Sequence, residues 1–286
     1  MERREATAAA EAASVSAKAP GTRKHAPLIK AGAAYVPLDP SYPGERLRHI
    51  FTESEATVLL TESSLASKAR EHFEGIVLEL DTQAHAIAAN PTTRLTREQT
   101  GVRPNDVCYV IYTSGTTGRP KGVTAEHRHV VKFAAAFNKI CGTTPDDRVY
   151  QGFSLTFDGS VEELWMAFSN GSALVVGDAE TPRFGDELAA YLESRGVTYF
   201  STVPTLLATF TRDVATLKTV VLSGEICPAE LVARRARAGL RIFNVYGPTE
   251  ATVNTTALEC VPGRAITIGR PLEGYGIHIV DERSEE

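Results

Sequence analysis

The segment at positions 112–122 holds a high density of groups that can bind phosphate. It reads YTSGTTGRPKG and directly follows an apolar segment, Val107–Ile111, that predicts a buried strand. Glycine lets the backbone approach a ligand closely, and backbone N–H groups and Ser/Thr hydroxyls donate hydrogen bonds to phosphate oxygens. Lys121 adds a mobile positive charge. We therefore predict a nucleotide phosphate loop made of Thr113, Ser114, Gly115, Thr116, Thr117, Gly118 and Lys121.

Two other interpretations of this segment are weaker. It is not a Walker A loop, because Pro120 stands where that pattern requires a glycine before its lysine. A purely structural glycine-threonine turn rarely places so many donors directly after a strand. The segment thus predicts phosphate binding by a loop of another type.

A second candidate segment lies at positions 244–250 and reads NVYGPTE. The ring of Tyr246 can stack on a purine, the amide of Asn244 offers donors and acceptors, and Glu250 can hold a hard cation such as Mg²⁺. The alternative is a structural turn with a packed Tyr246 and a solvated Glu250. The phosphate loop elsewhere in the chain favours the functional interpretation.

The elements that must position these segments alternate in type from about Pro27 onward. The predicted strands are 56–61, 75–80, 107–111, 148–152, 173–176, 197–202, 219–222 and 241–245. The predicted helices are 45–52, 64–73, 126–140, 161–169, 186–194 and 228–238, with Pro228 in a first turn and Gly196 and Gly239 as C-terminal stops. This alternation predicts an α/β fold with mostly parallel sheets covered by helices.

In such folds ligands bind beyond the carboxyl ends of the strands. The phosphate loop and three other segments, 157–158, 223–225 and 246–247, all follow predicted strands. The candidate residues are therefore expected to gather at one edge of the sheet.

Composition narrows the class of protein. The chain has 286 residues and a net charge of −5, and it lacks a basic cluster, so we expect no nucleic-acid binding. No apolar run approaches the roughly 20 residues of a membrane span. The four cysteines have no CxxC spacing, which predicts buried free thiols in a reducing, cytoplasmic compartment. Residues 1–25 are alanine-rich and predict a disordered or loosely helical tail.

The phosphate loop resembles that of the adenylate-forming enzymes, the AMP-dependent synthetase and ligase superfamily. Three further segments narrow the resemblance to the amino-acid adenylation domains of nonribosomal peptide synthetases. They are KAGAAYVPLDP at positions 30–40 (with Tyr42-Pro43 and Arg46-Leu47), FDGS at 157–160 and NVYGPTE at 244–250. The segments occur in the family's order and cover the chain from about Ala26 to Asp281.

This resemblance implies a role for several residues. Tyr246 would stack on adenine, followed by Gly247 in the same turn, while the backbone of Gly224 and Glu225 would lie beside the base. Thr249 would touch the α-phosphate and Glu250 would help to bind Mg²⁺. The groups implied in catalysis are Thr116, Lys121 and Glu250.

Asp158 would pair with the α-ammonium group of an amino-acid substrate. A buried carboxylate is costly without a cation, which fits that role. The alternative is a helix N-cap, since Asp158 precedes Gly-Ser-Val-Glu-Glu.

The family's substrate pocket maps residue by residue onto Asp158, Gly159, Glu162, Ser201, Val221, Ser223, Val245, Val253 and Asn254. Most of these side chains are small or apolar, so Glu162 stands out. If its carboxylate faces the pocket, it favours a substrate of opposite charge, and we expect lysine or ornithine. The alternative is that Glu162 turns to solvent or caps the first turn of its helix.

The implied reaction joins an amino acid to ATP, releasing pyrophosphate and forming an aminoacyl-adenylate. The aminoacyl group then passes to the phosphopantetheine thiol of a carrier protein on another chain. By comparison with the family, the chain looks truncated at both ends. Residues 26–265 would form a partial adenylation core and 266–286 the start of a β-barrel subdomain, and the small C-terminal lid domain would be absent.

We therefore expect poor turnover from this chain alone. Two alternatives remain. One is a non-catalytic remnant that binds a nucleotide or a partner. The other is a ligase that activates carboxylic acids for coenzyme A, which Asp158 and the segment 35–40 argue against.

Overall fold

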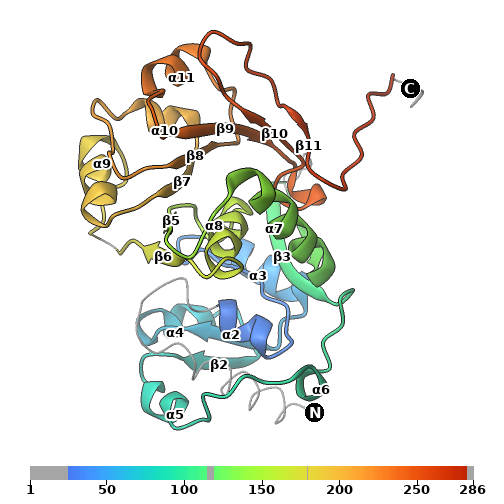
Figure 1. Cartoon of the computed structure of the whole chain (residues 1–286). Coiled ribbons are helices and arrows are strands. Elements are labelled where there is room, and N and C mark those ends of the chain that lie inside the picture. Colours follow the sequence, from blue (N-terminus) through green and yellow to red (C-terminus); the bar gives the residue numbers. More distant parts are fainter. Residues whose placement is uncertain (1–24, 115–118, 179, 282–286) are drawn as a thin grey trace. The chain divides into compact units, whose positions relative to one another are not determined.

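The computed structural model describes residues 25–114, 119–178 and 180–281, which form two compact units (Figure 1). Unit 1 comprises the described residues up to Val130 together with Leu155–Phe157. Unit 2 comprises Val131–Ser154 and the described residues from Asp158 onward. The predicted tail at 1–25 lies outside the described residues except for His25.

Unit 1 contains two small sheets and several short helices. Strands β1 (Val58–Thr61) and β2 (Ile76–Glu79) pair in parallel, and β3 (Val107–Ser114) and β4 (Pro120–Glu126) pair antiparallel. The helices are α2 (His25–Lys30), α3 (Gly44–Ser54), α4 (Ser63–Arg70), α5 (Ala84–Ala88), α6 (Arg97–Thr100) and the start of α7 (His127–Cys141).

Helix α3 shows how the sequence builds this unit. Its apolar residues Leu47, Ile50 and Phe51 recur at helical spacing and are buried. Phe51 packs on Phe73 with ring centroids 4.7 Å apart. Leu59 of β1 packs against the same cluster, so α3 covers one face of the β1–β2 sheet.

The hairpin β3–β4 corrects the prediction for the phosphate loop. Tyr112, Thr113 and Ser114 continue strand β3, and they pair with Gly122, Lys121 and Pro120 of β4. Residues 112–114 and 120–122 of the predicted eleven-residue loop are therefore paired strand, and positions 115–118 lie outside the described residues. The sequence prediction ended the strand too early because Thr and Ser were assigned to the loop, although Thr fits a strand well.

Unit 2 is built on a seven-stranded sheet with the order β11-β10-β9-β8-β7-β5-β6. Strands β9 (Arg241–Tyr246), β8 (Thr219–Leu222), β7 (Tyr199–Thr202), β5 (Arg148–Gln151) and β6 (Ala173–Val176) are parallel to one another. Strands β10 (Thr256–Glu259) and β11 (Arg270–Pro271) extend the sheet antiparallel. The helices are α7, α8 (Gly159–Phe168), α9 (Gly185–Ser194), α10 (Pro204–Ala208) and α11 (Ala229–Arg235), with the short 3₁₀ helix η3 (Thr249–Ala251).

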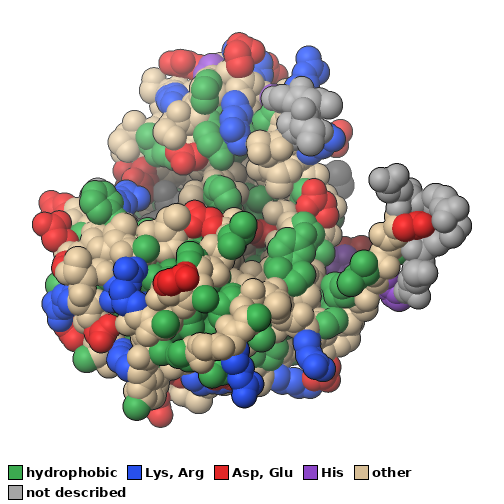
Figure 2. Space-filling model, turned by 90° about the horizontal axis from the view of Figure 1, so that it is seen from above, with side chains coloured by type: hydrophobic (Ala, Val, Ile, Leu, Met, Phe, Trp, Pro, Cys, Tyr) green, Lys and Arg blue, Asp and Glu red, His purple; other side chains and the backbone are tan. Residues whose placement is uncertain are grey.

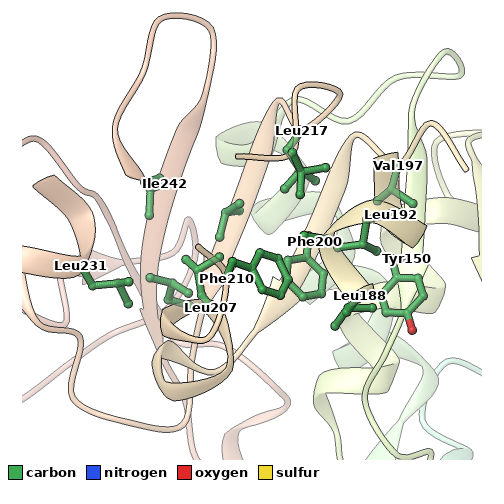
Figure 3. Close-up of a cluster of buried hydrophobic side chains, with 14 of the residues drawn as sticks. Tyr150, Leu188, Leu192, Val197, Phe200, Leu207, Phe210, Leu217, Leu231 and Ile242 are labelled. Atoms are coloured by element: carbon green, nitrogen blue, oxygen red, sulfur yellow. The ribbon is translucent and has the colours of Figure 1, made fainter. Parts of the chain in front are cut away.

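One face of this sheet forms the hydrophobic core of unit 2. Phe200, Val220, Leu222 and Ile242 from successive strands pack against α9, α10 and α11 through Leu188, Leu192, Leu207 and Leu231 (Figure 3). Because side chains alternate along a strand, the intervening residues face the opposite side, toward α8. All four residues of β7 and of β8 are buried, as expected for parallel strands covered on both faces.

The α/β prediction is confirmed, and most predicted elements lie within two residues of those observed. Strands 173–176 and 219–222 match β6 and β8. The prediction of a helix at 228–238 is wrong at its end, since α11 stops at Arg235 and Gly239 is no stop. Ala236 is extended there, and the Arg237 side chain donates to the carbonyl oxygens of Val214 and Leu217, which holds the chain out of a helix.

The surface and the thiols agree with an ordinary globular chain. On the face drawn in Figure 2, lysine and arginine side chains of the described residues are interspersed with acidic ones. All four cysteines are free and buried, as predicted. Within the described residues, no helix is both long enough and apolar enough to span a membrane. A cavity of about 840 Å³ lies inside unit 1, and no predicted site residue lines it.

Candidate functional site

Asp158 stands at the start of α8 and is half-buried. It occupies the N-cap position, but its side chain makes no capping hydrogen bond. Its Oδ2 atom is buried and has no hydrogen-bond partner. Burial raises the pKa of this carboxyl, and a hydrogen bond from the Thr249 side chain partly lowers it. The capping alternative therefore does not account for this carboxylate.

Glu162 lies one turn further along α8 and is 1% exposed, so the alternative that it turns to solvent is wrong. Tyr199 Oη donates to its Oε1 atom at 2.8 Å, and Asn254 Nδ2 donates to its Oε2 atom at 2.6 Å. Burial raises the pKa of Glu162, while the two hydrogen bonds lower it. The carboxylate is thus held by neutral donors.

Strand register explains why other predicted pocket residues share the sheet face of Tyr199, the hydrogen-bond partner of Glu162. Ser201 of β7 lies opposite Val221 of β8, and Val221 lies opposite Phe243 of β9. Val245, two residues beyond Phe243, points to the same face of the sheet. Ser201 lies beside Glu162 and lowers its pKa, yet its buried hydroxyl makes no hydrogen bond of regular geometry. These residues form a small, mainly apolar floor on the α8 side of the sheet.

The segment carrying Val253 and Asn254 is held in a strained conformation. Thr252 and Val253 both have positive φ, at 64° and 67°, although both are β-branched. Such residues rarely adopt this conformation, so the surroundings must impose it. Gly247 packs directly against this backbone, because a Cβ atom there would lie 2.1 Å from the Val253 carbonyl oxygen. Gly247 therefore helps to place Asn254 against Glu162.

Replacing Gly247 with alanine is expected to lower the free energy of unfolding by about 2 kcal/mol or more, because the added methyl meets backbone rather than a movable side chain. Urea denaturation of the two proteins measures the change. The control is Gly276→Ala, where the new Cβ meets only His278 Nε2 at 3.6 Å. Equal stability of Gly247→Ala and the parent protein would contradict this account of the turn.

The predicted purine-binding segment follows β9 on the same unit. Tyr246 is 51% exposed at the carboxyl end of β9, and its carbonyl oxygen accepts hydrogen bonds from Thr255. An exposed aromatic ring on an anchored backbone can serve as a stacking surface. Asn244 is instead buried, and its Nδ2 atom donates to the Thr267 carbonyl oxygen at 2.8 Å. Its side chain thus secures the segment that follows β10.

Thr249 and Glu250 lie on η3, close to Asp158. The side chain of Thr249 is hydrogen-bonded to Asp158, and the charge of Glu250 raises the pKa of Asp158. Glu250 is exposed. Mg²⁺ in nucleotide sites is usually bound by one or two carboxylates together with phosphate oxygens and water. A single exposed carboxylate such as Glu250 suits that donor set, and the described residues contain no group of three or more potential metal ligands.

The strand end after β8 supplies Ser223, Gly224 and Glu225. Gly224 has a φ of +78°, which suits glycine. The Glu225 carboxylate accepts hydrogen bonds from the backbone N–H and the hydroxyl of Thr205, at 3.0 and 2.8 Å. Its side chain therefore secures the start of α10, and its backbone is the part left for a ligand. On α8, Gly159 packs closely against the ring of Phe153.

The predicted phosphate-binding residues belong to unit 1. Gly115, Thr116, Thr117 and Gly118 lie outside the described residues. Thr113 and Lys121 face each other on β3 and β4, and Thr113 Oγ1 is 3.5 Å from the Lys121 carbonyl oxygen. The Lys121 side chain is exposed, and no ion pair with another described residue engages it. The hairpin thus presents Lys121 on β4 with an exposed side chain.

Two buried residues beside the predicted site were missed from the sequence. Tyr199 holds Glu162, and it could have been found because it lies two residues before Ser201 on the same face of β7. Glu163 is fully buried and accepts hydrogen bonds from the backbone N–H groups of Gly152 and Phe153, at 2.9 and 3.2 Å. Burial raises its pKa well above the usual range. No local pattern distinguishes Glu163 from a solvated helix residue.

The chain is similar to AMP-binding enzymes and to peptide synthetases both in sequence and in structure. The family model described as AMP-binding enzyme matches residues 28–286. Phosphinothricin tripeptide synthetase PhsC from Streptomyces viridochromogenes is 40% identical over 257 residues, which are 89% of this chain and 23% of that protein. Tyrocidine synthase 3 from Brevibacillus parabrevis is 35% identical over 264 residues, which are 90% of this chain and 4% of that protein.

A solved structure of the nonribosomal peptide synthetase FmoA3 in its AMPPNP-bound form superposes with a TM-score of 0.78 at 27% identity. The match covers 96% of this chain and 32% of FmoA3. The chain therefore spans less than a third of the length of each of these three proteins.

Proposed function

The chain belongs to the family of AMP-binding enzymes, and from that membership we propose that it activates an amino acid with ATP, forming aminoacyl-AMP and pyrophosphate. The observation that carries the proposal is a pair of carboxylates at the start of α8, the half-buried N-cap Asp158 and the fully buried Glu162. Asp158 presents an unpartnered buried oxygen, and Glu162 is held only by neutral donors. A buried anion of this kind is compensated best by a cation, which the substrate would supply.

The reaction depends more on orienting the amino acid against ATP and on neutralising phosphate charge than on acid–base chemistry. In our proposal Tyr246 stacks on the adenine, beside the backbone of Gly224 and Glu225, and Thr249 contacts the α-phosphate. Thr116 and Lys121 neutralise the leaving pyrophosphate. Glu250 would hold Mg²⁺, which supplies further positive charge to the phosphates when it is bound. The AMPPNP-bound structure of FmoA3 supports ATP as the nucleotide.

We propose further that the substrate is a basic amino acid, lysine or ornithine. Asp158 would bind its α-ammonium group and Glu162 the ammonium group of its side chain. Gly159, Ser201, Val221, Ser223, Val245 and Val253 would contact the aliphatic part. The aminoacyl group would then pass to the phosphopantetheine thiol of a carrier protein, as the similarity to nonribosomal peptide synthetases suggests. The four buried thiols support a cytoplasmic location.

The proposal is tested by screening amino acids for binding to the 286-residue chain, by calorimetry, and for ATP–pyrophosphate exchange. We expect lysine or ornithine to bind more tightly than leucine and to support exchange above background. Exchange is to be repeated with a C-terminal adenylation domain supplied as a separate chain. Preference for leucine would overturn the basic substrate, and the absence of binding by every amino acid would overturn the function itself.

A further inference from the structure

The hydroxyl group of Tyr199 is a buried polar group that no part of the proposed reaction uses. Tyr199 is 2% exposed and lies on β7. On one side its Oη atom is 2.8 Å from Glu162 Oε1, and on the other it is 3.9 Å from the Sγ atom of Cys141. A buried phenol placed between a carboxylate and a thiol has a specific task, since leaving it unpaired would be costly.

The chemistry of the neighbours sets the direction of these hydrogen bonds. An ionised carboxylate can only accept, so Tyr199 donates to Glu162, and the Cys141 thiol can donate to Tyr199 in turn. Asn254 Nδ2 is also a donor, and it reaches the other carboxylate oxygen at 2.6 Å. Each oxygen of Glu162 therefore receives one hydrogen bond from a neutral side chain.

These two hydrogen bonds fix the carboxylate and leave part of its acceptor capacity unused. A carboxylate offers about four lone-pair sites, so two remain. The Glu162 side chain has several rotatable torsions, and without Tyr199 its carboxylate could rotate away from the floor made by Ser201 and Val221. Tyr199 and Asn254 thus hold the Glu162 carboxylate in one orientation.

We infer that Tyr199 is a positioning residue that determines specificity, holding the ionised Glu162 carboxylate toward the side-chain ammonium group of a basic substrate. This inference rests on the proposed function. Tyr199 does not touch the substrate in this account. It acts through Glu162, so its removal affects recognition of a charged side chain and leaves recognition of a neutral side chain intact.

The test is Tyr199→Phe, which removes only the hydroxyl. Binding of lysine and of norleucine, a neutral analogue of similar length, is measured by calorimetry on the whole chain. We expect the affinity for lysine to fall about 10- to 100-fold, the range for a lost hydrogen bond to a charged group. The affinity for norleucine is expected to stay close to that of the parent protein, and the melting temperature to fall modestly because Glu162 Oε1 loses one donor. The matched control is Tyr150→Phe, a buried tyrosine on the neighbouring strand β5.

A double-mutant cycle separates positioning from a general loss of structure. If Tyr199 acts through Glu162, adding Tyr199→Phe to Glu162→Gln causes no further loss of lysine affinity. If Tyr199→Phe lowers the lysine affinity as much in the Glu162→Gln protein as it does in the parent protein, the inference is overturned. Unchanged lysine affinity in Tyr199→Phe alone also overturns it. These outcomes leave the proposed function standing. If the parent protein binds no amino acid, the proposed function fails first and the inference falls with it.

Discussion

Replacing Glu162 with glutamine is expected to lower the affinity for lysine and ornithine about 100-fold or more. The substitution keeps the size of the side chain but removes the negative charge that would pair with the substrate ammonium group. Breaking a buried pair by removing one partner typically costs about 3–5 kcal/mol, which exceeds a change in affinity of about 100-fold. Neutral amino acids of similar length should bind as well as before, or better.

Calorimetric titration with lysine and norleucine measures this change. The control is Glu230→Gln, an exposed glutamate on α11 that lies outside the proposed pocket. Unchanged preference for lysine over norleucine in Glu162→Gln would show that Glu162 does not read the substrate side chain.

The pH dependence of binding provides a second readout of the same charge. Burial raises the pKa of Glu162, and the nearby carboxylates of Asp158 and Glu163 disfavour a further negative charge. Tyr199 and Cys141, the other titratable groups near this carboxyl, stay neutral because burial raises their pKa values as well. Lysine affinity is therefore expected to fall as the pH drops through the raised pKa of Glu162. The ratio of lysine to norleucine affinity removes the contribution of Asp158, and in Glu162→Gln this ratio should not change with pH.

Replacing Asp158 with asparagine is expected to weaken binding of every amino acid about 100-fold, whatever its side chain, because the α-ammonium group loses its partner. The same substitution should stabilise the free protein at neutral pH. Burial raises the pKa of Asp158. The stability that such a group contributes is present below its unfolded pKa and is lost as the pH rises through its folded pKa. Because asparagine carries no charge, Asp158→Asn does not lose this stability as the pH rises.

Calorimetry with two or more amino acids and urea denaturation at neutral pH test these two effects together. The matched control is Asp146→Asn, an exposed aspartate in the loop before β5. A variant that binds amino acids normally would contradict the role of Asp158. A variant that is markedly less stable would instead indicate that Asp158 supports the fold.

The sequence predicted the parts of the site that depend on local pattern. The alternation of short apolar strands and amphipathic helices predicted β7, β8, β9 and α8. The resemblance to adenylation domains supplied the pocket residues on them, such as Ser201, Val221 and Val245. A strand period of two then puts them on one face of a parallel sheet. The register observed between β7, β8 and β9 brings them level with one another.

Other features could not be read from the sequence because distant parts of the chain decide them. Asn254 meets Glu162 across 92 positions. Val253 adopts a left-handed conformation that its β-branched side chain disfavours, so tertiary packing overrides local preference there. The antiparallel hairpin β3–β4 was missed for a related reason, since the pairing of Ser114 with Pro120 joins residues on both sides of a glycine-rich segment whose composition is typical of an open loop.

Strands β7, β8 and β9 carry the hydrophobic core on one face and the proposed substrate pocket on the other. Phe200, Val220 and Ile242 anchor the interior, whereas Ser201, Val221 and Val245 point the other way. In the proposed pocket, substrate preference would therefore be changed at every second position of these strands, while the residues of the hydrophobic core stay as they are.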